Sequence, residues 1–298
     1  NAMISRREFF TVPIAAVSVA AQLNAAPKPA YKAGGIKLGC QTNAWRIDAS
    51  NFDNVLAVLR TLKELGYEGF ETGFRNVQGQ FANSAAARKQ IEATGLKFLG
   101  CHVFLDKYDE QTQVAPLDLV QRIADGAASL GAERLILSGG GLIRDGKVAA
   151  DALKRKADGL NAAGKYCRSK GIRLAYHNHG PEFEAGGLEI EGLYAHTDPA
   201  LVDFLHDFGW AFYAKANVPS FFAKHHKRIV GMHLRDFKNG EQVPLGQGLF
   251  PIRELAVAIQ KAKWSGWAIN EEERLSGEKP GEKAVAPARQ TMKQIFDK

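Results

Sequence analysis

Short apolar runs alternate along this chain with longer segments in which apolar residues recur at helical spacing. The runs are almost continuously apolar and do not alternate strictly with polar residues, which is typical of strands buried on both faces. We therefore expect a buried parallel sheet. The predicted strands are 36–40, 67–71, 97–103, 134–138, 172–177, 201–207, 229–234 and 266–271.

The segments between these runs are predicted to be amphipathic helices. The clearest is 51–65, whose apolar residues share one face, with Ser50 as the predicted cap at its start and Gly66 at its end. Pro199 and Pro219 interrupt the segments after the fifth and sixth strands, so the helical pattern is less regular there. The predicted helices are 51–65, 84–94, 115–130, 148–170, 251–263 and 283–297.

Eight units of strand followed by helix within about 265 residues have the size and order of an α/β (β/α)8 barrel, or TIM barrel. The alternative is a doubly wound open sheet, but no G-x-G-x-x-G motif follows the first strand. The glycine-rich segment 138–141 lacks the residues of a phosphate-binding loop, so we interpret it as a tight turn. We predict a single TIM-barrel catalytic domain over residues 28–298.

Residues 1–27 are interpreted as a cloning remnant followed by a signal segment. Paired arginines, Arg6 and Arg7, precede a short apolar run and an alanine-rich stretch, which resembles a twin-arginine export signal. We expect a periplasmic protein, or a cytoplasmic one if the segment is instead a short helix that opens the fold. The apolar run is too short to span a bilayer, so no stable membrane insertion is predicted.

Charge argues against a nucleic-acid partner, and cysteine content argues against disulfide bonds. The formal net charge is +7, but basic residues are scattered among acidic ones, and we interpret the one dense cluster, 224–228, as a solvated helix end. We therefore predict no nucleic-acid partner. The 3 cysteines are an odd and sparse set, which argues against a disulfide framework. Cys40 and Cys101 lie in apolar strands and are predicted to be packing residues.

Polar residues end most of the predicted strands, and in a TIM barrel these ends form the active site. The fifth to the eighth strands each end in a histidine, an aspartate or a glutamate. Such side chains can converge at the barrel mouth, where mixed imidazole and carboxylate ligands suit one divalent ion of Mn, Co, Zn or Fe. The strand-end polar residues are Glu71, His102, Ser138, His177, His179, Asp207, His233, Asp236, Glu271, Glu272 and Glu273.

Several motifs, taken in their order and spacing, resemble the sugar phosphate isomerase/epimerase family with a xylose-isomerase-like TIM barrel. They are GYEGFE at the second strand, YHNHGPEF at the fifth, HDFGW at the sixth, GMHLRDF at the seventh, PLGQGLFPI beyond it and GWAINEEE at the eighth. The resemblance runs from about residue 36 to the C-terminus. It implies one divalent ion whose ligands here would be His177, Asp207, His233 and Glu271.

His177 departs from the family pattern, because a glutamate of an E-N-H triplet usually stands there. Some relatives carry Y-H-N-H and a tryptophan three residues after the aspartate of the sixth strand, as Trp210 follows Asp207 here. The chain therefore resembles that branch of the family.

The departure bears on the chemistry that the resemblance implies. In the epimerases, glutamates from the fifth and eighth strands exchange the proton next to a carbonyl that the metal polarises. Glu271 remains here, whereas a metal-bound imidazole at His177 is a poor base because its lone pair is engaged. We therefore predict that His179 or Glu182 is the second proton carrier.

The predicted activity is that of a metal-dependent isomerase or epimerase that enolises a sugar or keto-sugar. A metal-dependent lyase or dehydratase that eliminates a beta substituent from a keto-sugar or keto-glycoside is the alternative, and a non-catalytic periplasmic sugar-binding protein is a third. We reject an abasic-site endonuclease, which needs a histidine at position 210. The expected partner is a small carbohydrate, and relatives commonly form homo-oligomers. Substrate contacts are predicted from Glu71, His102, Trp210, Lys215 and Arg235.

Overall fold

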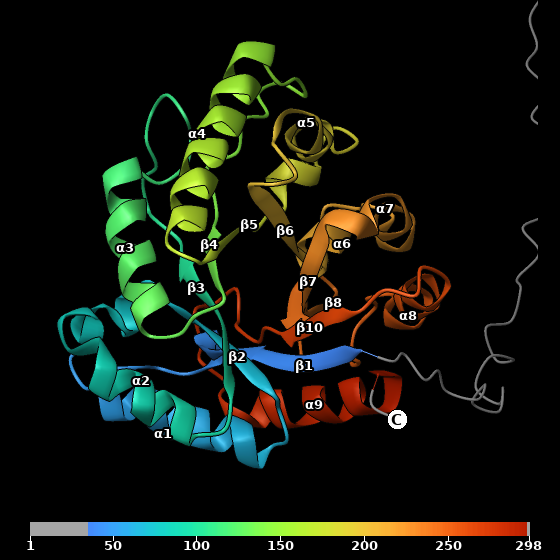
Figure 1. Cartoon of the computed structure of the whole chain (residues 1–298). Coiled ribbons are helices and arrows are strands. Elements are labelled where there is room, and N and C mark those ends of the chain that lie inside the picture. Colours follow the sequence, from blue (N-terminus) through green and yellow to red (C-terminus); the bar gives the residue numbers. More distant parts are fainter. Residues whose placement is uncertain (1–34, 297–298) are drawn as a thin grey trace, which may run out of the picture. The chain divides into compact units, whose positions relative to one another are not determined.

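The computed structural model describes residues 35–296, in which parallel strands close into a barrel (Figure 1). The order around the ring is β1-β10-β7-β6-β5-β4-β3-β2, and the first and last strands complete it by pairing in register from Ile36 opposite Gly266. The predicted TIM barrel is confirmed, with each strand close to its expected bounds. The barrel strands are β1 (Ile36–Gln41), β2 (Gly69–Gly73), β3 (Lys97–Val103), β4 (Arg134–Leu137), β5 (Arg173–Tyr176), β6 (Val202–Asp207), β7 (Ile229–Leu234) and β10 (Gly266–Asn270).

Helices surround the barrel and bury their apolar faces against it (Figure 1). In α1 the buried positions include Val55, Leu59 and Leu62, which lie three or four residues apart as the helical period requires. Gly66 follows this helix with φ of +87°, a conformation that favours glycine. The helices are α1 (Phe52–Glu64), α2 (Ser84–Ala93), α3 (Leu117–Ser129), α4 (Ala150–Ser169), α5 (Leu188–His196), α6 (Phe208–Tyr213), α7 (Val218–His225), α8 (Ile252–Lys261) and α9 (Glu282–Phe296).

The interior of the barrel is divided into an apolar layer and a polar layer above it. Ala175, Leu205 and Ile269 belong to one buried cluster with other strand residues. Alternate strand residues point to the same side of a sheet, so the positions two residues further along these strands also face the interior. Those positions are occupied by polar residues at the carboxyl ends of the strands. The apolar cluster therefore forms the bottom of a polar cavity.

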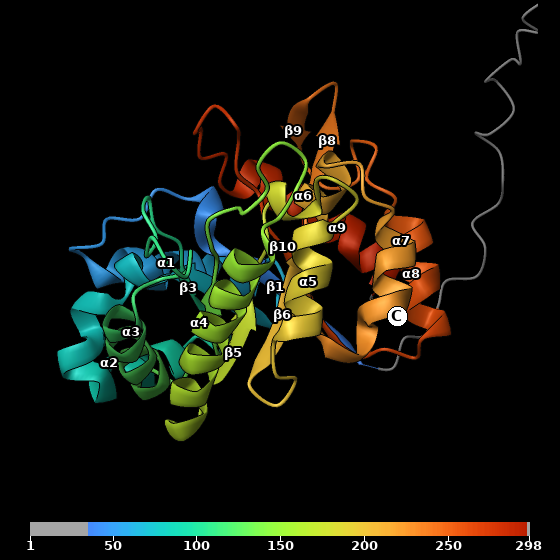
Figure 2. The ribbon, with the colours of Figure 1, turned by 90° about the horizontal axis from the view of Figure 1, so that it is seen from above.

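Some details differ from the sequence-based expectations. Asn51 caps α1 by accepting a hydrogen bond from the Asp53 amide, whereas Ser50 bonds to Asp48, so the predicted cap is wrong by one residue. Pro219 lies in the first turn of α7, where it needs no amide partner and begins the helix instead of breaking it. A small hairpin of β8 (Asp236–Lys238) and β9 (Glu241–Val243), which was not predicted, rises beside the carboxyl end of β7 (Figure 2).

The predicted signal segment, 1–27, lies outside the described residues, and twin-arginine export stays a prediction. Within residues 35–296, no helix has both the length and the apolar character needed to cross a membrane. The three cysteines are free and buried, in agreement with the prediction of no disulfide framework.

Candidate metal centre

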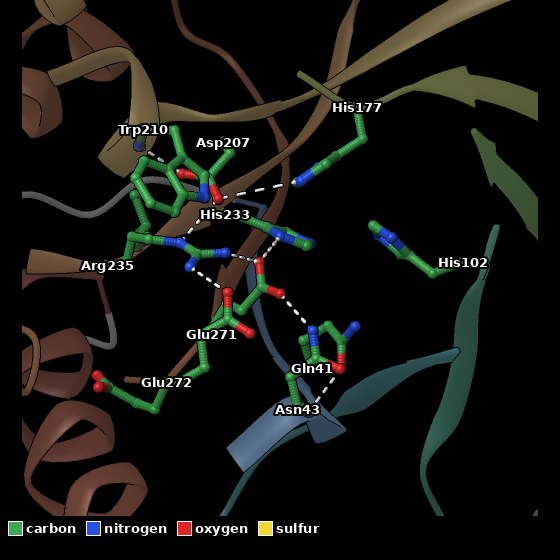
Figure 3. Close-up of polar contacts among 12 residues, drawn as sticks. Gln41, Asn43, His102, His177, Asp207, Trp210, His233, Arg235, Glu271 and Glu272 are labelled. Carbon is green, nitrogen blue, oxygen red and sulfur yellow. Dashed lines mark hydrogen bonds and ion pairs between the residues drawn. The ribbon is translucent and has the colours of Figure 1, made fainter. Parts of the chain in front are cut away.

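A cavity of about 450 Å³ opens at the carboxyl ends of the barrel strands. Six of the predicted site residues line it, and all of them except His179 are labelled in Figure 3. Because these residues come from five different strands or their following loops, only the closed barrel brings them together. The predicted residues in the lining are His102, His177, His179, Trp210, Arg235 and Glu271.

Four of the predicted residues form a buried group able to hold a metal ion. One ligand atom each of His177, Asp207, His233 and Glu271 lies within 4.8 Å of the others. They provide two imidazoles and two carboxylates, a donor set that suits Mn, Co, Zn or Fe. Asp207 Oδ2 is buried and makes no aligned hydrogen bond, although Arg235 Nε lies 2.8 Å away as an ion pair, so the oxygen has a lone pair left for a metal ion. The residues present therefore fit a divalent ion.

His177 presents a ligand atom to this group because of how its ring is held. Its Nδ1 lies 3.2 Å from the Leu205 carbonyl oxygen, which can only accept a hydrogen bond, so Nδ1 carries the proton. The lone pair of Nε2 is then free and lies 4.0 Å from Asp207 Oδ2. Burial, followed by the neighbouring histidines, lowers the pKa of His177 well below its usual value. A neutral imidazole is the form that binds metals.

Arg235 supplies positive charge to the same cluster. Its Nε lies 2.8 Å from Asp207 Oδ2 and its Nη2 lies 2.5 Å from Glu271 Oε2, while Nη1 donates to Glu273 at 2.8 Å. The stem of Arg235 passes over Gly209, where an added Cβ would lie 2.0 Å from Arg235 Cγ. Glycine at this position of HDFGW is therefore needed for the arginine to reach the carboxylates.

His233 lies between two carboxylates and is strongly affected by them. Its Nε2 is 2.6 Å from Glu71 Oε2, and its Nδ1 contacts Glu271 Oε2. Burial opposes the charged ring, but Glu271 and Glu71 outweigh it and raise the pKa of His233 to about 10. Glu71 therefore lies under the cavity as a partner of His233 and is not part of the cavity lining, where a substrate contact was predicted.

The two carboxylates of the candidate ligand set differ in their surroundings. Burial raises the pKa of Asp207 to about 6 despite the opposing charge of Arg235. For Glu271, burial is outweighed by Arg235 and His233, so its pKa lies well below the usual value and the group is ionised at neutral pH. Asn43 Nδ2 also donates to Glu271 Oε1 at 2.7 Å.

His179 lines the cavity but lies outside the candidate ligand set. Its ring centroid is 5.4 Å from that of His177, consistent with both projecting from the same side of the segment after β5. Burial lowers the pKa of His179 to about 4, so the ring is neutral at pH 7 and can accept a proton.

Glu182 and Lys215 lie outside both the ligand cluster and the cavity lining. The Glu182 carboxylate is buried and accepts hydrogen bonds from the Tyr176 hydroxyl at 2.7 Å and from the His179 amide at 3.1 Å. The chain turns back through a 3-10 helix at Pro181–Phe183, which directs Glu182 behind His179. Lys215 lines a different groove, beside α7. Catalysis by Glu182 and substrate contact by Lys215 are therefore not supported by their placement.

The cavity also includes residues that were not among the predicted catalytic, metal-binding or substrate-binding residues. Asn43 and Gln41 reach it from the end of β1, where the strand continues into a short 3-10 turn without a motif. Glu273 and Lys279 come from the loop after β10, and Phe104 from the loop after β3. Only Glu273 gave a signal, as one of three consecutive glutamates. The others become visible only when the barrel has closed.

The sequence of this chain is similar to those of several known proteins. The family described as "Xylose isomerase-like TIM barrel" matches residues 59–295. An inosose dehydratase from Bacillus anthracis is 23% identical over 281 residues, covering 82% of this chain and 92% of that protein. An inosose dehydratase from Bacillus licheniformis is 31% identical over 140 residues, which is 41% of this chain and 47% of that protein.

Solved structures share the fold. A sugar phosphate isomerase/epimerase from Parabacteroides distasonis has a TM-score of 0.67 and 20% identity, with 90% of this chain and 96% of that chain covered. The IOLI protein with a bound zinc atom has a TM-score of 0.70 and 16% identity, with 86% and 96% covered. Metal binding at this fold therefore has a structural precedent.

Proposed function

Because this chain belongs to the xylose isomerase-like TIM barrel family, we propose that it is a divalent-metal-dependent enzyme that removes the proton next to the carbonyl of a sugar or keto-sugar. The observation that carries the proposal is the buried convergence of His177, Asp207, His233 and Glu271 beside an open cavity. The two sequence relatives described above are named as dehydratases and one structural neighbour as an isomerase/epimerase, and both reactions can begin with this proton transfer.

The four clustered residues would hold the ion, whose chemistry is polarisation of a carbonyl and stabilisation of negative charge on its oxygen. Glu271 is ionised and faces the cavity, so we assign it the first proton transfer. Asn43 and Arg235 orient its carboxylate through bonds to both oxygens. Trp210 lies over the Arg235 guanidinium, with the arginine 5.2 Å from the ring centroid, and closes that side against water.

Isomerisation or epimerisation would need a second proton carrier on another side of the substrate. The part of the cavity lined by β3 to β5 presents histidines, and no carboxylate among the described lining residues comes from it. His102 and His177 belong to a second group that could hold a metal, together with His233, whereas His179 belongs to neither group and keeps a neutral ring. We therefore assign the return of the proton to His179, and Glu182 holds the His179 backbone in place.

Elimination is the second candidate, and the placement of Glu182 favours it. With this carboxylate turned away, Glu271 and Glu273 are the carboxylates in the described cavity lining, and both follow β10. A dehydratase needs a base on one side and an acid at the leaving group, which a carboxylate and a histidine can provide. The names of the inosose dehydratase relatives support this reaction class.

One experiment distinguishes these outcomes. The metal-loaded protein is incubated with a panel of keto-sugars and keto-glycosides in deuterated water and followed by NMR. Deuterium next to the carbonyl with an intact carbon skeleton indicates isomerisation or epimerisation, and an unsaturated keto-sugar indicates elimination. Absence of both exchange and elimination across the panel would contradict the proposed function.

Glu271→Gln provides the control for mechanism. It should abolish exchange or elimination, whereas Glu64→Gln, on the exposed face of α1, should leave the rate unchanged. Full activity in Glu271→Gln would contradict the role assigned to Glu271, and purified protein that binds no divalent ion would instead favour a sugar-binding protein. Metal analysis of protein purified without chelator identifies the ion among Mn, Co, Zn and Fe.

Export through the twin-arginine pathway is a separate proposal, supported only by Arg6, Arg7 and the apolar run that follows. Cell fractionation tests it, with a lysine pair in place of the two arginines as the control. Equal periplasmic amounts of both versions would contradict it.

A further inference from the structure

We propose that the substrate is a glycoside, whose reacting sugar ring occupies the metal-site cavity and whose second ring occupies a separate aromatic cavity next to it. The inference rests on the proposed function and names its substrate class. The second cavity has a volume of about 290 Å³. His179 and Trp210 line both cavities, so a ligand that extends past these two side chains leaves one and enters the other.

Aromatic side chains form one wall of the second cavity. Trp210 and Tyr213 stand three residues apart on α6, so their side chains share a face of the helix. Their ring centroids are 5.5 Å apart, and Phe237 of β8 packs against both, at 5.4 Å from Trp210 and 4.7 Å from Tyr213. Tyr213 nevertheless stays 40% exposed, because it faces the cavity.

This aromatic wall is held rigidly from the metal-site side. The Arg235 guanidinium lies 5.2 Å from the Trp210 ring centroid and is itself fixed by its carboxylate partners (Figure 3). Flat, fixed aromatic surfaces next to open space bind the apolar face of a sugar ring or an aromatic ring. The wall therefore suits a ring-shaped substituent of the reacting sugar.

Gly180 leaves the space in front of Trp210 open. Its φ of −61° and ψ of −46° lie in the helical region, which the following Pro181 disfavours for a residue with a Cβ, so glycine eases this turn as well. A Cβ added at Gly180 would meet only Trp210 atoms, at an ordinary 4.0 Å. The space in front of the Trp210 ring is thus free of side-chain atoms from this position. The exposed Glu184 carboxylate at the same cavity can accept hydrogen bonds from sugar hydroxyl groups.

Equilibrium binding tests the inference without requiring turnover. The full-length, zinc-loaded protein is titrated with phenyl β-D-glucopyranoside and with methyl β-D-glucopyranoside by isothermal calorimetry. The wild type should bind the phenyl glucoside at least about tenfold more tightly, because only this ligand carries a ring for the second cavity. Gly180→Leu fills the cavity and should reduce that preference to less than about threefold.

Two further variants keep the test interpretable. Gly79→Leu places the same side chain at an exposed glycine with nothing within 4 Å, and it should retain the tenfold preference. Tyr213→Ala removes a half-exposed ring and should lose the preference even if Gly180→Leu folds poorly. Equal binding of the two glucosides to the wild type, no binding of the phenyl glucoside, or a preference that survives both cavity variants would overturn the inference. Failure of isotope exchange alone would refute the proposed reaction and leave this binding result standing.

Discussion

At the scale of single residues, the candidate site is a cluster of charged side chains that determine one another's protonation state. His233 and Arg235 supply the positive charge in the ligand cluster that balances Glu71, Asp207 and Glu271. A divalent ion would bring positive charge to the same carboxylates, so we expect it to compete with the proton on His233. The arrangement explains how so many acidic groups can be buried together.

The convergence of polar side chains was predictable from sequence because each ends a strand, and the family resemblance selected the four candidate ligands among them. His177, Asp207, His233 and Glu271 follow apolar runs, and the barrel brings such ends together. The direction of Glu182 was not predictable, because it depends on the 3-10 turn after β5 and on a hydrogen bond from Tyr176. Asn43 was also missed, since its partner Glu271 lies on the opposite end of the chain.

Removing the amide of Asn43 should weaken catalysis without removing the metal ligands. We expect Asn43→Ala to lower kcat about 10-fold or more, because Glu271 loses the hydrogen bond that orients Oε1. Metal affinity should change less than kcat. Steady-state kinetics together with metal titration check this, and an unchanged kcat would show that Asn43 does not position Glu271.

The cysteine thiols should not react with thiol reagents in the native protein. Burial raises the pKa of both Cys101 and Cys167 to about 12, and that of Cys40 is raised well above its usual value, so none forms a thiolate at pH 8. An Ellman assay at pH 8 should detect no thiol in the folded protein and three in guanidinium chloride. Rapid reaction of any thiol in the native state would contradict the buried placement.

At the scale of elements, a buried ion pair joins α4 to α5 and to the loop after β4. Lys156 Nζ lies 2.5 Å from Glu189 Oε1 and also donates to the Gly140 carbonyl, while Glu189 Oε2 accepts from the Leu142 amide at 2.7 Å. Both side chains of the pair are fully buried. The glycine-rich loop predicted to be a tight turn is thus held by charges from two helices.

Lys156→Met should destabilise the protein by about 3–5 kcal/mol, because it leaves the Glu189 carboxylate buried without its partner. The double variant Lys156→Met with Glu189→Gln should recover most of this loss, since the amide oxygen can still accept from Leu142. Urea unfolding measures the free energies of unfolding. Equal stability of the single and double variants would show that the pair is not the cause.

Element positions were largely predictable, since the barrel repeats a simple pattern of buried strand and amphipathic helix. The exceptions are α5, α6 and α7, short helices in segments where the pattern was irregular and no helix bounds were predicted. In α6, residues are chosen for their contacts with the candidate site more than for a regular amphipathic pattern. Asp207 caps the helix by accepting from the Trp210 amide, and Gly209 makes room for Arg235.

At the scale of the whole molecule, the candidate ligands come from β5, β6, β7 and β10 or the residues that follow them, so metal binding should stabilise the entire barrel. With ion at about 100 times its Kd, the free energy of unfolding should rise by about 2.7 kcal/mol. For a domain of this size that corresponds to a rise in Tm of about 5–10 °C. Differential scanning calorimetry with added Zn²⁺ or Mn²⁺ measures it.

Asp207→Asn is the matched variant for the thermal measurement. Replacing a residue that only hydrogen-bonds to a metal ligand typically lowers metal affinity about 10–100-fold. Replacing a ligand itself should lower it more, so most of the metal-induced rise in Tm should disappear. The same metal-induced rise in Asp207→Asn would show that the ion binds elsewhere.

The pairing of β1 with β10 closes the ring with the first and last strands of the barrel. During synthesis on the ribosome, β1 can pair with β2 early, but its other edge stays unpaired until β10 has been translated, near the end of the domain. Closing the ring then joins segments that are separated by most of the chain. Glu271 follows β10 directly and arrives at the same moment. A nascent chain that stops before this strand therefore lacks both the closed barrel and the proposed proton acceptor, so incomplete products cannot acquire partial activity.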